Sequence, residues 1–216
     1  MPCNQQRSIQ FALRQNFSRY EQLMEYLIRH IEDYAKLSEY EKENMLLFVK
    51  KRHFEKNEII FSEGKIANEI YFVTKGCVRL FYNVDGKDRT AFFYTDGQFI
   101  CAGESYTYNV PARENYQAIE KTEIYVFDKT NIEKLLEVSS KFELIARIAT
   151  ENELIVCQRI IASFVTKSAE ERYIELLETN GELFQRVPQQ YIASFLGVSP
   201  ETLSRIKKRV LSKGNS

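Results

Sequence analysis

The chain has 216 residues, of which 44% are hydrophobic and 28% charged, and its 30 basic and 30 acidic residues leave no net charge. This composition is typical of a soluble globular protein with room for two modest domains. The sequence lacks apolar runs of the roughly 18–20 residues that a membrane helix needs, and its first residues lack the apolar core of a signal peptide. We therefore expect a cytoplasmic protein with no membrane contact.

Residues 1–20 are polar and weakly patterned, and we expect them to form an extension. Leu23, Leu27, Ile31 and Tyr34 then share one face of a short amphipathic helix. Ser38 and Glu41 have the spacing of a capping box, which predicts a second helix through about residue 50.

Between residues 57 and 128 the pattern changes to short β-branched and aromatic runs: IIF, IYFV, CVRLFY, TAFFY, FICA and EIYVF. Glycines at positions 64, 76, 86, 97 and 103 separate these runs. Short strands with glycine turns at this spacing predict an antiparallel roll, sandwich or barrel. Asp85-Gly86 between two of the runs is a strong hairpin signal.

A short helix over 131–138 should lead into one long helix over about 141–165. This helix is apolar on more than one face, so one face can cover the roll and another can pair with a second subunit. The alternative is a helix buried within one subunit. For the dimer seam the predicted residues are Ile145, Ile148, Asn152, Ile155 and Arg159. Polar residues in the seam, Arg159 among them, could set its register or contact a ligand.

The C-terminal residues predict a helix-turn-helix. Ser168 and Glu171 form a second capping box, and Gly181 is a plausible end for that helix. Pro188 then opens a short helix with Ile192, Ala193 and Leu196 inward; Gly197 supplies the turn; Ser199 caps a second helix that begins at Pro200, with Leu203, Ile206 and Val210 inward.

Charge supports a DNA-facing surface at this end. From Arg186 onward the sequence has six basic residues and one acidic residue, Glu201, which is a local net charge of +5. A helix-turn-helix places its second helix in the major groove, with its first residues at the base edges. We also considered a helical hairpin that merely packs.

The cysteines give no metal-binding spacing. They stand singly, at Cys3, Cys77, Cys101 and Cys157, and the sequence has only two histidines. We expect buried thiols, no metal site and no catalytic centre.

The segments EIIFSEG, EIYFVTKGCVRLFY, DGK, DGQFICAGES and GVSPETLSRI, in this order, resemble the CRP/FNR family of bacterial transcription regulators over residues 37–210. The resemblance implies an α+β fold: an antiparallel, cupin-like, jelly-roll-type β-roll of the cyclic-nucleotide-binding kind with flanking helices, a long dimerisation helix and a shortened winged helix-turn-helix. The corresponding domains are residues 1–20 (extension), 21–138 (sensor roll), 139–166 (dimerisation helix) and 167–216 (DNA-binding domain). Residues 181–187 could retain part of the wing.

The resemblance assigns Glu201 and Arg205 to base edges, and the chemistry agrees, because Arg can donate to guanine and Glu can accept from cytosine. The remaining polar residues of this helix suit DNA backbone contacts or caps: Ser199, Thr202, Ser204, Lys207, Lys208 and Arg209. The implied partners are an inverted repeat of double-stranded DNA, a second copy of the chain and RNA polymerase.

The effector is left open by the sequence. The phosphate-binding cassette of nucleotide-responsive members begins with Gly-Glu and ends with Arg-Ser; Gly103-Glu104-Ser105 matches its start, but Arg113 is followed by Glu114. The residues at the positions that face the base, Cys157 and Gln158, have less obvious pairing chemistry. We therefore favour another small molecule over cAMP or cGMP. An apolar pocket suited to a small acid could be lined by Tyr106, Tyr108, Tyr116, Phe92, Phe93 and Arg113, although these aromatics could equally be roll core.

Two other classes of function were considered. One is a nucleotide-binding regulatory module that acts through protein contacts without specific DNA binding. The other is a cupin-type enzyme, which the two scattered histidines and the lack of a nucleophile–base pair disfavour.

Overall fold

The computed structural model describes residues 24–214, and the side chains of the last two of these are outside the description. The predicted extension, Cys3 and Leu23 lie outside the described residues. The chain forms two compact units. One contains the residues up to Lys50 together with Phe127–Ile148; the other contains Lys51–Val126 and the residues from Ala149 onward.

The first unit is helical. It contains a helix over residues 24–32, α2 (Glu39–Phe48), α4 (Lys129–Val138) and the first residues of α5 (Ser140–Thr166). Leu27 and Ile31 are buried, so the apolar spacing that predicted the first helix does mark its inner face, whereas Tyr34 lies beyond its last residue. Met45 of α2 is buried as well. Asp128 caps α4 by accepting from the Asn131 N–H at 2.9 Å.

The predicted capping box of α2 is confirmed. Ser38 Oγ accepts from the Glu41 N–H at 3.3 Å, and Glu41 accepts from the Ser38 N–H at 2.6 Å. Glu41 also receives Lys141 Nζ at 2.9 Å. A hydrogen bond with Ser139, followed by those of Ser38 and Lys141, lowers the pKa of Glu41 to about 2. One carboxylate therefore both caps α2 and joins it to the start of α5.

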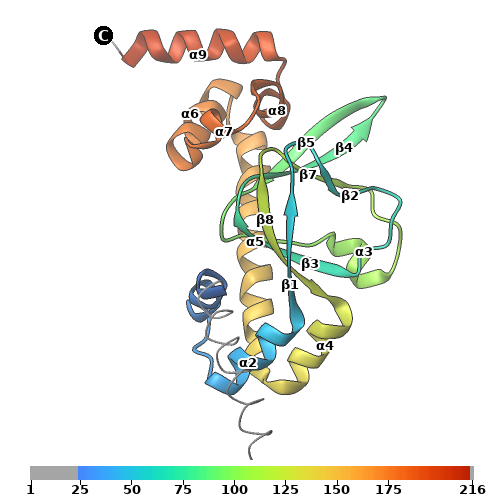
Figure 1. The fold of residues 1–216 in the computed structure, drawn as a ribbon. Helices are drawn as coiled ribbons and strands as arrows, with labels where there is room; N and C mark the ends of the chain where they lie inside the picture. Colours follow the sequence, from blue (N-terminus) through green and yellow to red (C-terminus); the bar gives the residue numbers. More distant parts are fainter. Residues whose placement is uncertain (1–23, 215–216) are drawn as a thin grey trace, which may run out of the picture. The chain divides into compact units, whose positions relative to one another are not determined.

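The roll consists of two four-stranded sheets, ordered β1-β8-β3-β6 and β2-β7-β4-β5 (Figure 1). Their strands are β1 (Val49–Phe54), β2 (Ile59–Phe61), β3 (Glu69–Lys75), β4 (Val78–Val84), β5 (Lys87–Tyr94), β6 (Phe99–Ile100), β7 (Asn115–Ala118) and β8 (Thr122–Asp128). A short helix, α3 (Gly103–Tyr108), lies between β6 and β7 in the sequence.

The predicted hairpin at Asp85-Gly86 is confirmed. Val84 pairs with Lys87, and both turn residues have positive φ, 50° at Asp85 and 73° at Gly86. A two-residue loop with positive φ at both positions matches the right-handed twist of the strands that it joins.

The strand boundaries differ from expectation in two places. The helix expected through residue 50 ends at Phe48, and β1 starts at Val49, eight residues before the predicted start of the roll. The β1 sequence, VKKRHF, is buried only at its two ends, so it lacks the alternation that announces a half-buried strand. β7 was also not predicted, because its residues NYQA carry little apolar character.

Four helices follow α5: α6 (Ala169–Asn180), α7 (Leu183–Arg186), α8 (Gln189–Phe195) and α9 (Pro200–Gly214). The predicted capping box of α6 is present, with Ser168 and Glu171 exchanging backbone hydrogen bonds. Residues 181–187 hold the short helix α7, so the expectation that they retain part of a wing is wrong for this segment. The predicted fold class, an antiparallel roll, a long helix and a C-terminal helix-turn-helix, is confirmed (Figure 1).

Candidate nucleic-acid interface and effector site

The turn between α8 and α9 has the geometry that the sequence predicts. Gly197 has φ +70°, and a Cβ built there would lie 3.0 Å from the Phe164 ring. Glycine therefore serves both the left-handed backbone and the close approach of α5. Ser199 Oγ accepts from the Thr202 N–H at 3.2 Å and so caps α9, whose first residue is Pro200.

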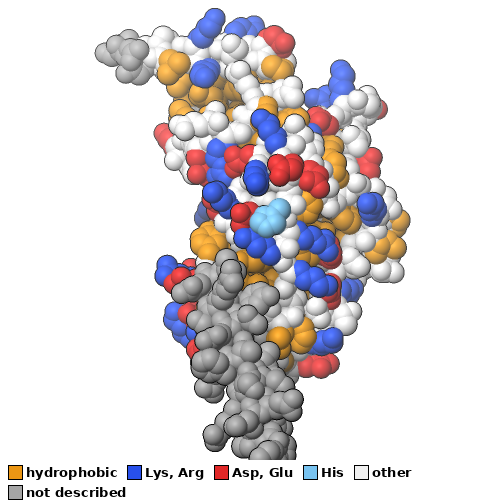
Figure 2. Space-filling view, viewed as in Figure 1, with side chains coloured by type: hydrophobic (Ala, Val, Ile, Leu, Met, Phe, Trp, Pro, Cys, Tyr) orange, Lys and Arg blue, Asp and Glu red, His pale blue; other side chains and the backbone are white. Residues whose placement is uncertain are grey.

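Helix α9 buries one face and presents another. Leu203 and Ile206 are buried, and Val210 packs against the same cluster. On the opposite side Glu201, Arg205 and Lys208 are exposed and follow a spacing of four and three residues. Several basic side chains lie along this helix, at the top of Figure 2.

Glu201 and Arg205, the two residues predicted to contact DNA bases, interact with neighbouring residues of the same turn and helix. Arg205 Nη2 donates to Thr202 Oγ1 at 3.0 Å. A hydrogen bond with the Ser199 side chain, then one from its own backbone N–H and the charge of Arg205, lower the pKa of Glu201, so its carboxylate is ionised at neutral pH.

The residues predicted to contact the DNA backbone differ in their surroundings. Lys207 and Lys208 are exposed, and within residues 24–214 neither forms an ion pair. Arg209 instead pairs with Glu170 of α6 at 2.6 Å. Ser199 acts as the cap, and Thr202 and Ser204 are half-buried.

Arg186 does not belong to the basic DNA-facing set in which its charge was counted. Its guanidinium contacts Glu120 at 2.6 Å and Asp96 at 3.6 Å, and donates to the carbonyl of Gly76 at 2.7 Å. These partners lie 66 to 110 residues away in the sequence, so the local count of charges could not reveal them; a further partner, Glu182 at 3.4 Å, lies just before the counted segment. The local net charge of +5 counted from the sequence is therefore too high for the outward-facing surface of the helix-turn-helix.

Strands β4 and β5 of the roll contact α8 directly. The Arg79 guanidinium carbon lies 4.1 Å from the Phe81 ring centroid and 3.7 Å from that of Tyr191. The Thr90 N–H donates to Ser194 Oγ at 3.0 Å, and the rings of Phe93 and Phe195 are 5.4 Å apart.

All three nitrogens of the Arg79 guanidinium form hydrogen bonds. Arg79 is buried, and it donates to Gln117 at 2.8 Å, Asp88 at 2.7 Å and Thr90 at 3.3 Å. Sequence reasoning missed it, because it looked like one more residue of the strand CVRLFY.

The predicted effector residues are only partly brought together. Gly103 and Glu104 open α3 and are exposed, whereas Ser105 is buried and its Oγ accepts from the Ala67 N–H at 2.8 Å. Tyr116 is also buried, and its hydroxyl donates to the Cys101 carbonyl at 3.1 Å. On α5, Cys157 is half-buried and Gln158 is exposed.

The six residues proposed to line an apolar pocket do not share one. Tyr116 belongs to the core of the roll, and Phe92 and Tyr106 pack against that core. Phe93 joins the cluster beneath α8 instead, and Tyr108 is 73% exposed. The alternative interpretation, roll core, is therefore correct for Tyr116.

The cassette does not fit a cyclic phosphate. Arg113 is 78% exposed, lies 3.9 Å from Glu104, and has its own backbone N–H bound by Glu114 at 3.0 Å. A phosphate placed here would meet two carboxylates for one arginine, which opposes an anion.

Sequence reasoning also missed Glu153 of α5, whose carboxyl group contacts the core of the roll. Tyr94 Oη donates to Glu153 Oε1 at 2.9 Å. Burial raises the pKa of Glu153, and burial followed by the charges of Glu114, Cys101 and Glu153 raises that of Tyr116. Glu153 lies on the face of α5 that is turned toward the roll, one turn before Cys157. An acidic residue at that position of the helix was the signal in the sequence for a carboxyl group with a raised pKa.

Nowhere in the described part of the chain do three His, Cys, Asp or Glu side chains gather where they could hold a metal ion. Within residues 24–214, no helix combines the length and the apolar character needed to cross a membrane. Burial raises the pKa of the Cys77 thiol to about 12, so this thiol is un-ionised and unreactive at neutral pH.

The roll and the helix-turn-helix both have counterparts among known proteins. Residues 51–139 match the family model of the cyclic nucleotide-binding domain. No curated protein matches the chain in sequence.

Solved structures match nearly the whole architecture. FixK2 from Bradyrhizobium japonicum is 23% identical with a TM-score of 0.66, covering 77% of this chain and 86% of its own. CLP from Xanthomonas campestris, a regulator responsive to c-di-GMP, is 18% identical with a TM-score of 0.66, covering 82% and 93%. A CRP/FNR family transcriptional regulator from Eubacterium rectale is 16% identical with a TM-score of 0.65, covering 82% and 85%. The chain therefore carries a cyclic nucleotide-binding domain within the fold of CRP/FNR regulators.

Proposed function

We propose that the protein is a homodimeric transcription regulator that binds an inverted repeat of double-stranded DNA and responds to a small effector. The observation that carries the proposal is α9, which a glycine turn and a serine cap orient so that Glu201, Arg205 and Lys208 share its exposed face. Such a face can enter the major groove, with Glu201 and Arg205 at base edges and the lysines at phosphates. The role is regulatory, in the cytoplasm, and involves no catalysis.

A dimer is supported by exposed apolar residues on α5. Leu154, Ile161 and Val165 follow a spacing of seven and four residues and are 56%, 64% and 80% exposed. Exposed apolar side chains at heptad-like spacing favour pairing with a second helix.

This seam replaces part of the predicted one. Ile145 is buried, so it is not available to a partner. Asn152 and Ile155 are exposed and Ile148 is half-buried, but with Arg159 they lie on a different face of α5 from Leu154, Ile161 and Val165.

Control by an effector is supported by the contacts between the roll and α8. Because Arg79, Thr90 and Phe93 are all on β4 or β5, a change in these strands alters the contacts of α8 directly. An effector regulates only if it binds two arrangements of these elements with different affinity.

The proposal is tested by titrating the purified protein onto a fluorescent DNA duplex at several salt concentrations while its mass is measured in solution. We expect a dimer whose DNA affinity falls steeply with salt. Ile161→Glu should give monomers and weaken DNA binding, whereas Leu136→Glu, at an exposed apolar residue outside the seam, should do neither. A dimeric protein without any salt-dependent DNA binding would favour a module that acts through protein contacts.

A further inference from the structure

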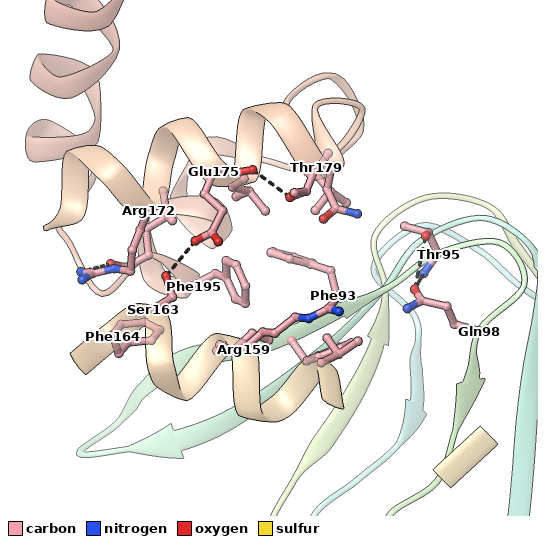
Figure 3. Close-up of a pocket in the computed structure, with 17 residues that line it drawn as sticks. Phe93, Thr95, Gln98, Arg159, Ser163, Phe164, Arg172, Glu175, Thr179 and Phe195 are labelled. Carbon is pink, nitrogen blue, oxygen red and sulfur yellow. Dashed lines mark hydrogen bonds between the residues drawn. The ribbon is translucent and has the colours of Figure 1, made fainter. Parts of the chain in front are cut away.

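A cavity of about 270 Å³ lies where the roll, α5 and the C-terminal helices meet (Figure 3). Its walls come from β5 and the following turn, from the second half of α5, and from α6 to α8. The cavity is separate from the cassette, because none of Gly103, Glu104 or Arg113 lines it. Its volume is just below the range of typical ligand pockets, so an occupant would be about the size of one substituted ring.

One wall carries a cation whose charge is not balanced. Arg159 extends from α5 along the cavity toward Phe93 (Figure 3). Within the described residues its side chain forms no hydrogen bond or ion pair. A guanidinium group has five N–H donors, and in a half-enclosed site these donors favour an anionic partner.

The only carboxylate among the described lining residues is already occupied. Glu175 receives Lys167 Nζ at 2.6 Å and the Ser163 hydroxyl at 3.0 Å; the contact with Ser163 is one of the dashed lines in Figure 3. The hydrogen bond from Lys167 lowers the pKa of Glu175, so the carboxylate is ionised but satisfied. The lining therefore offers positive charge without a competing free acid.

The rest of the lining suits a small apolar body. Phe92 and Phe93 of the roll and Phe195 of α8 provide aromatic walls, and the rings of Phe93 and Phe195 are 5.4 Å apart. Beyond them, Gln98 accepts from the Thr95 N–H at 2.6 Å through its oxygen, which leaves its amide N–H groups as further donors. Flat apolar walls with donors at the ends match an organic carboxylate better than an inorganic ion.

From these observations, we propose that this cavity binds a small organic anion, an aromatic or short aliphatic carboxylate, with Arg159 as the residue that binds its charge. Arg159 is thereby reassigned from the predicted dimer seam to a ligand site. If the protein is the regulator proposed above, the ligand bridges Phe93 on β5 and Phe195 on α8, and so favours one arrangement of roll and helix-turn-helix.

Binding itself is tested without DNA. The full-length protein is screened by ligand-observed NMR against benzoate, phenylacetate and hexanoate, and against benzamide, phenylacetamide and hexanamide as uncharged counterparts. We expect at least one acid to bind while its amide does not, and Arg159→Gln to weaken that binding by roughly tenfold or more. Gln98→Leu should weaken it by less. Because Arg159 is exposed, its replacement should leave the thermal unfolding temperature unchanged.

Arg113→Gln is the matched control, since it removes an exposed arginine from the cassette. Loss of acid binding in Arg113→Gln and its retention in Arg159→Gln would overturn the proposal and place the ligand in the roll. Failure of all three acids, or equal binding of acids and amides, would also overturn it. None of these outcomes bears on DNA binding, which the duplex titration measures separately.

Discussion

The guanidinium of Arg79 on β4 stacks on the ring of Tyr191 on α8, with 3.7 Å between the guanidinium carbon and the ring centroid. The same guanidinium carbon lies 4.1 Å from the ring centroid of Phe81. This cation, which contacts two rings, links the roll to the first helix of the helix-turn-helix through a contact that is neither a backbone hydrogen bond nor a salt bridge.

Removing the ring of Tyr191 should loosen this contact. We expect Tyr191→Ala to lower the free energy of unfolding by about 1–3 kcal/mol, because a partly desolvated cation–π contact and the packing of the ring are both lost. Tyr191→Phe keeps the ring and should remain close to the wild type. Urea unfolding measures both variants, and equal losses in the two would show that the hydroxyl, and not the ring, matters.

Arg205 should determine one base of the DNA site. Arg205→Ala is expected to cost about 1–3 kcal/mol on a cognate duplex and to relax the preference at one position. Arg205→Lys keeps the charge but loses the bidentate fork, so it should relax the preference as well. Competition titrations with single-base variants of the site measure this preference. Uniform weakening on every sequence would assign Arg205 to a phosphate.

Lys208 should act through charge alone. Lys208→Ala is expected to lower the slope of log affinity against log salt by about 0.9, the contribution of one phosphate contact, without changing base preference. The same titration on Lys36→Ala, an exposed lysine outside the helix-turn-helix, should give the wild-type slope. An unchanged slope in Lys208→Ala would exclude this lysine from the DNA interface.

Gly197 should tolerate no side chain. Gly197→Ala meets both a positive φ and the Phe164 ring at 3.0 Å, so we expect a loss of about 1–3 kcal/mol in unfolding free energy. Gly86→Ala has the positive φ with open space around the new methyl group and should cost less; Gly103→Ala has neither problem and should be nearly neutral. If Gly86→Ala were as costly as Gly197→Ala, the contact with Phe164 would contribute nothing.

Glu153 should make stability fall as the pH rises. Its pKa is raised by burial in the folded state, so the folded protein holds this proton more tightly than the unfolded chain does. The penalty is absent below the ordinary glutamate pKa of about 4.5 and develops as pH rises through the raised value. Glu153→Gln, which can still accept from Tyr94, should therefore be more stable than the wild type at pH 7 and equal to it near pH 4. Urea unfolding at the two pH values provides the comparison, and a constant difference would assign the effect to packing.

The sequence predicted those features that depend on neighbouring residues. The capping boxes at Ser38 and Ser168, the Asp85-Gly86 turn and the Gly197 turn each follow from residues within a few positions, and the structure confirms all four. Strand β1 could not be found this way, because its middle residues are exposed and polar.

The site was harder to predict, because its contacts join distant parts of the chain. Arg186 looked like a DNA-facing cation until its partners in the roll were known. Glu153 appeared as one polar residue of a long helix, and only the position of Tyr94 shows that it is turned toward the roll. Charge counted along a sequence cannot distinguish a free cation from one that a distant carboxylate already binds.

The most direct test of a dimeric, sequence-specific regulator is selection of bound sequences from random duplex DNA, with and without cAMP, using the wild type and Arg205→Ala. We predict that the wild type enriches an inverted repeat with half-sites about one helical turn apart, that cAMP does not change it, and that Arg205→Ala loses one position of each half-site. Enrichment that requires cAMP would contradict our assignment of the cassette. A wild-type library without any motif, indistinguishable from that of Arg205→Ala, would contradict sequence-specific recognition by α9.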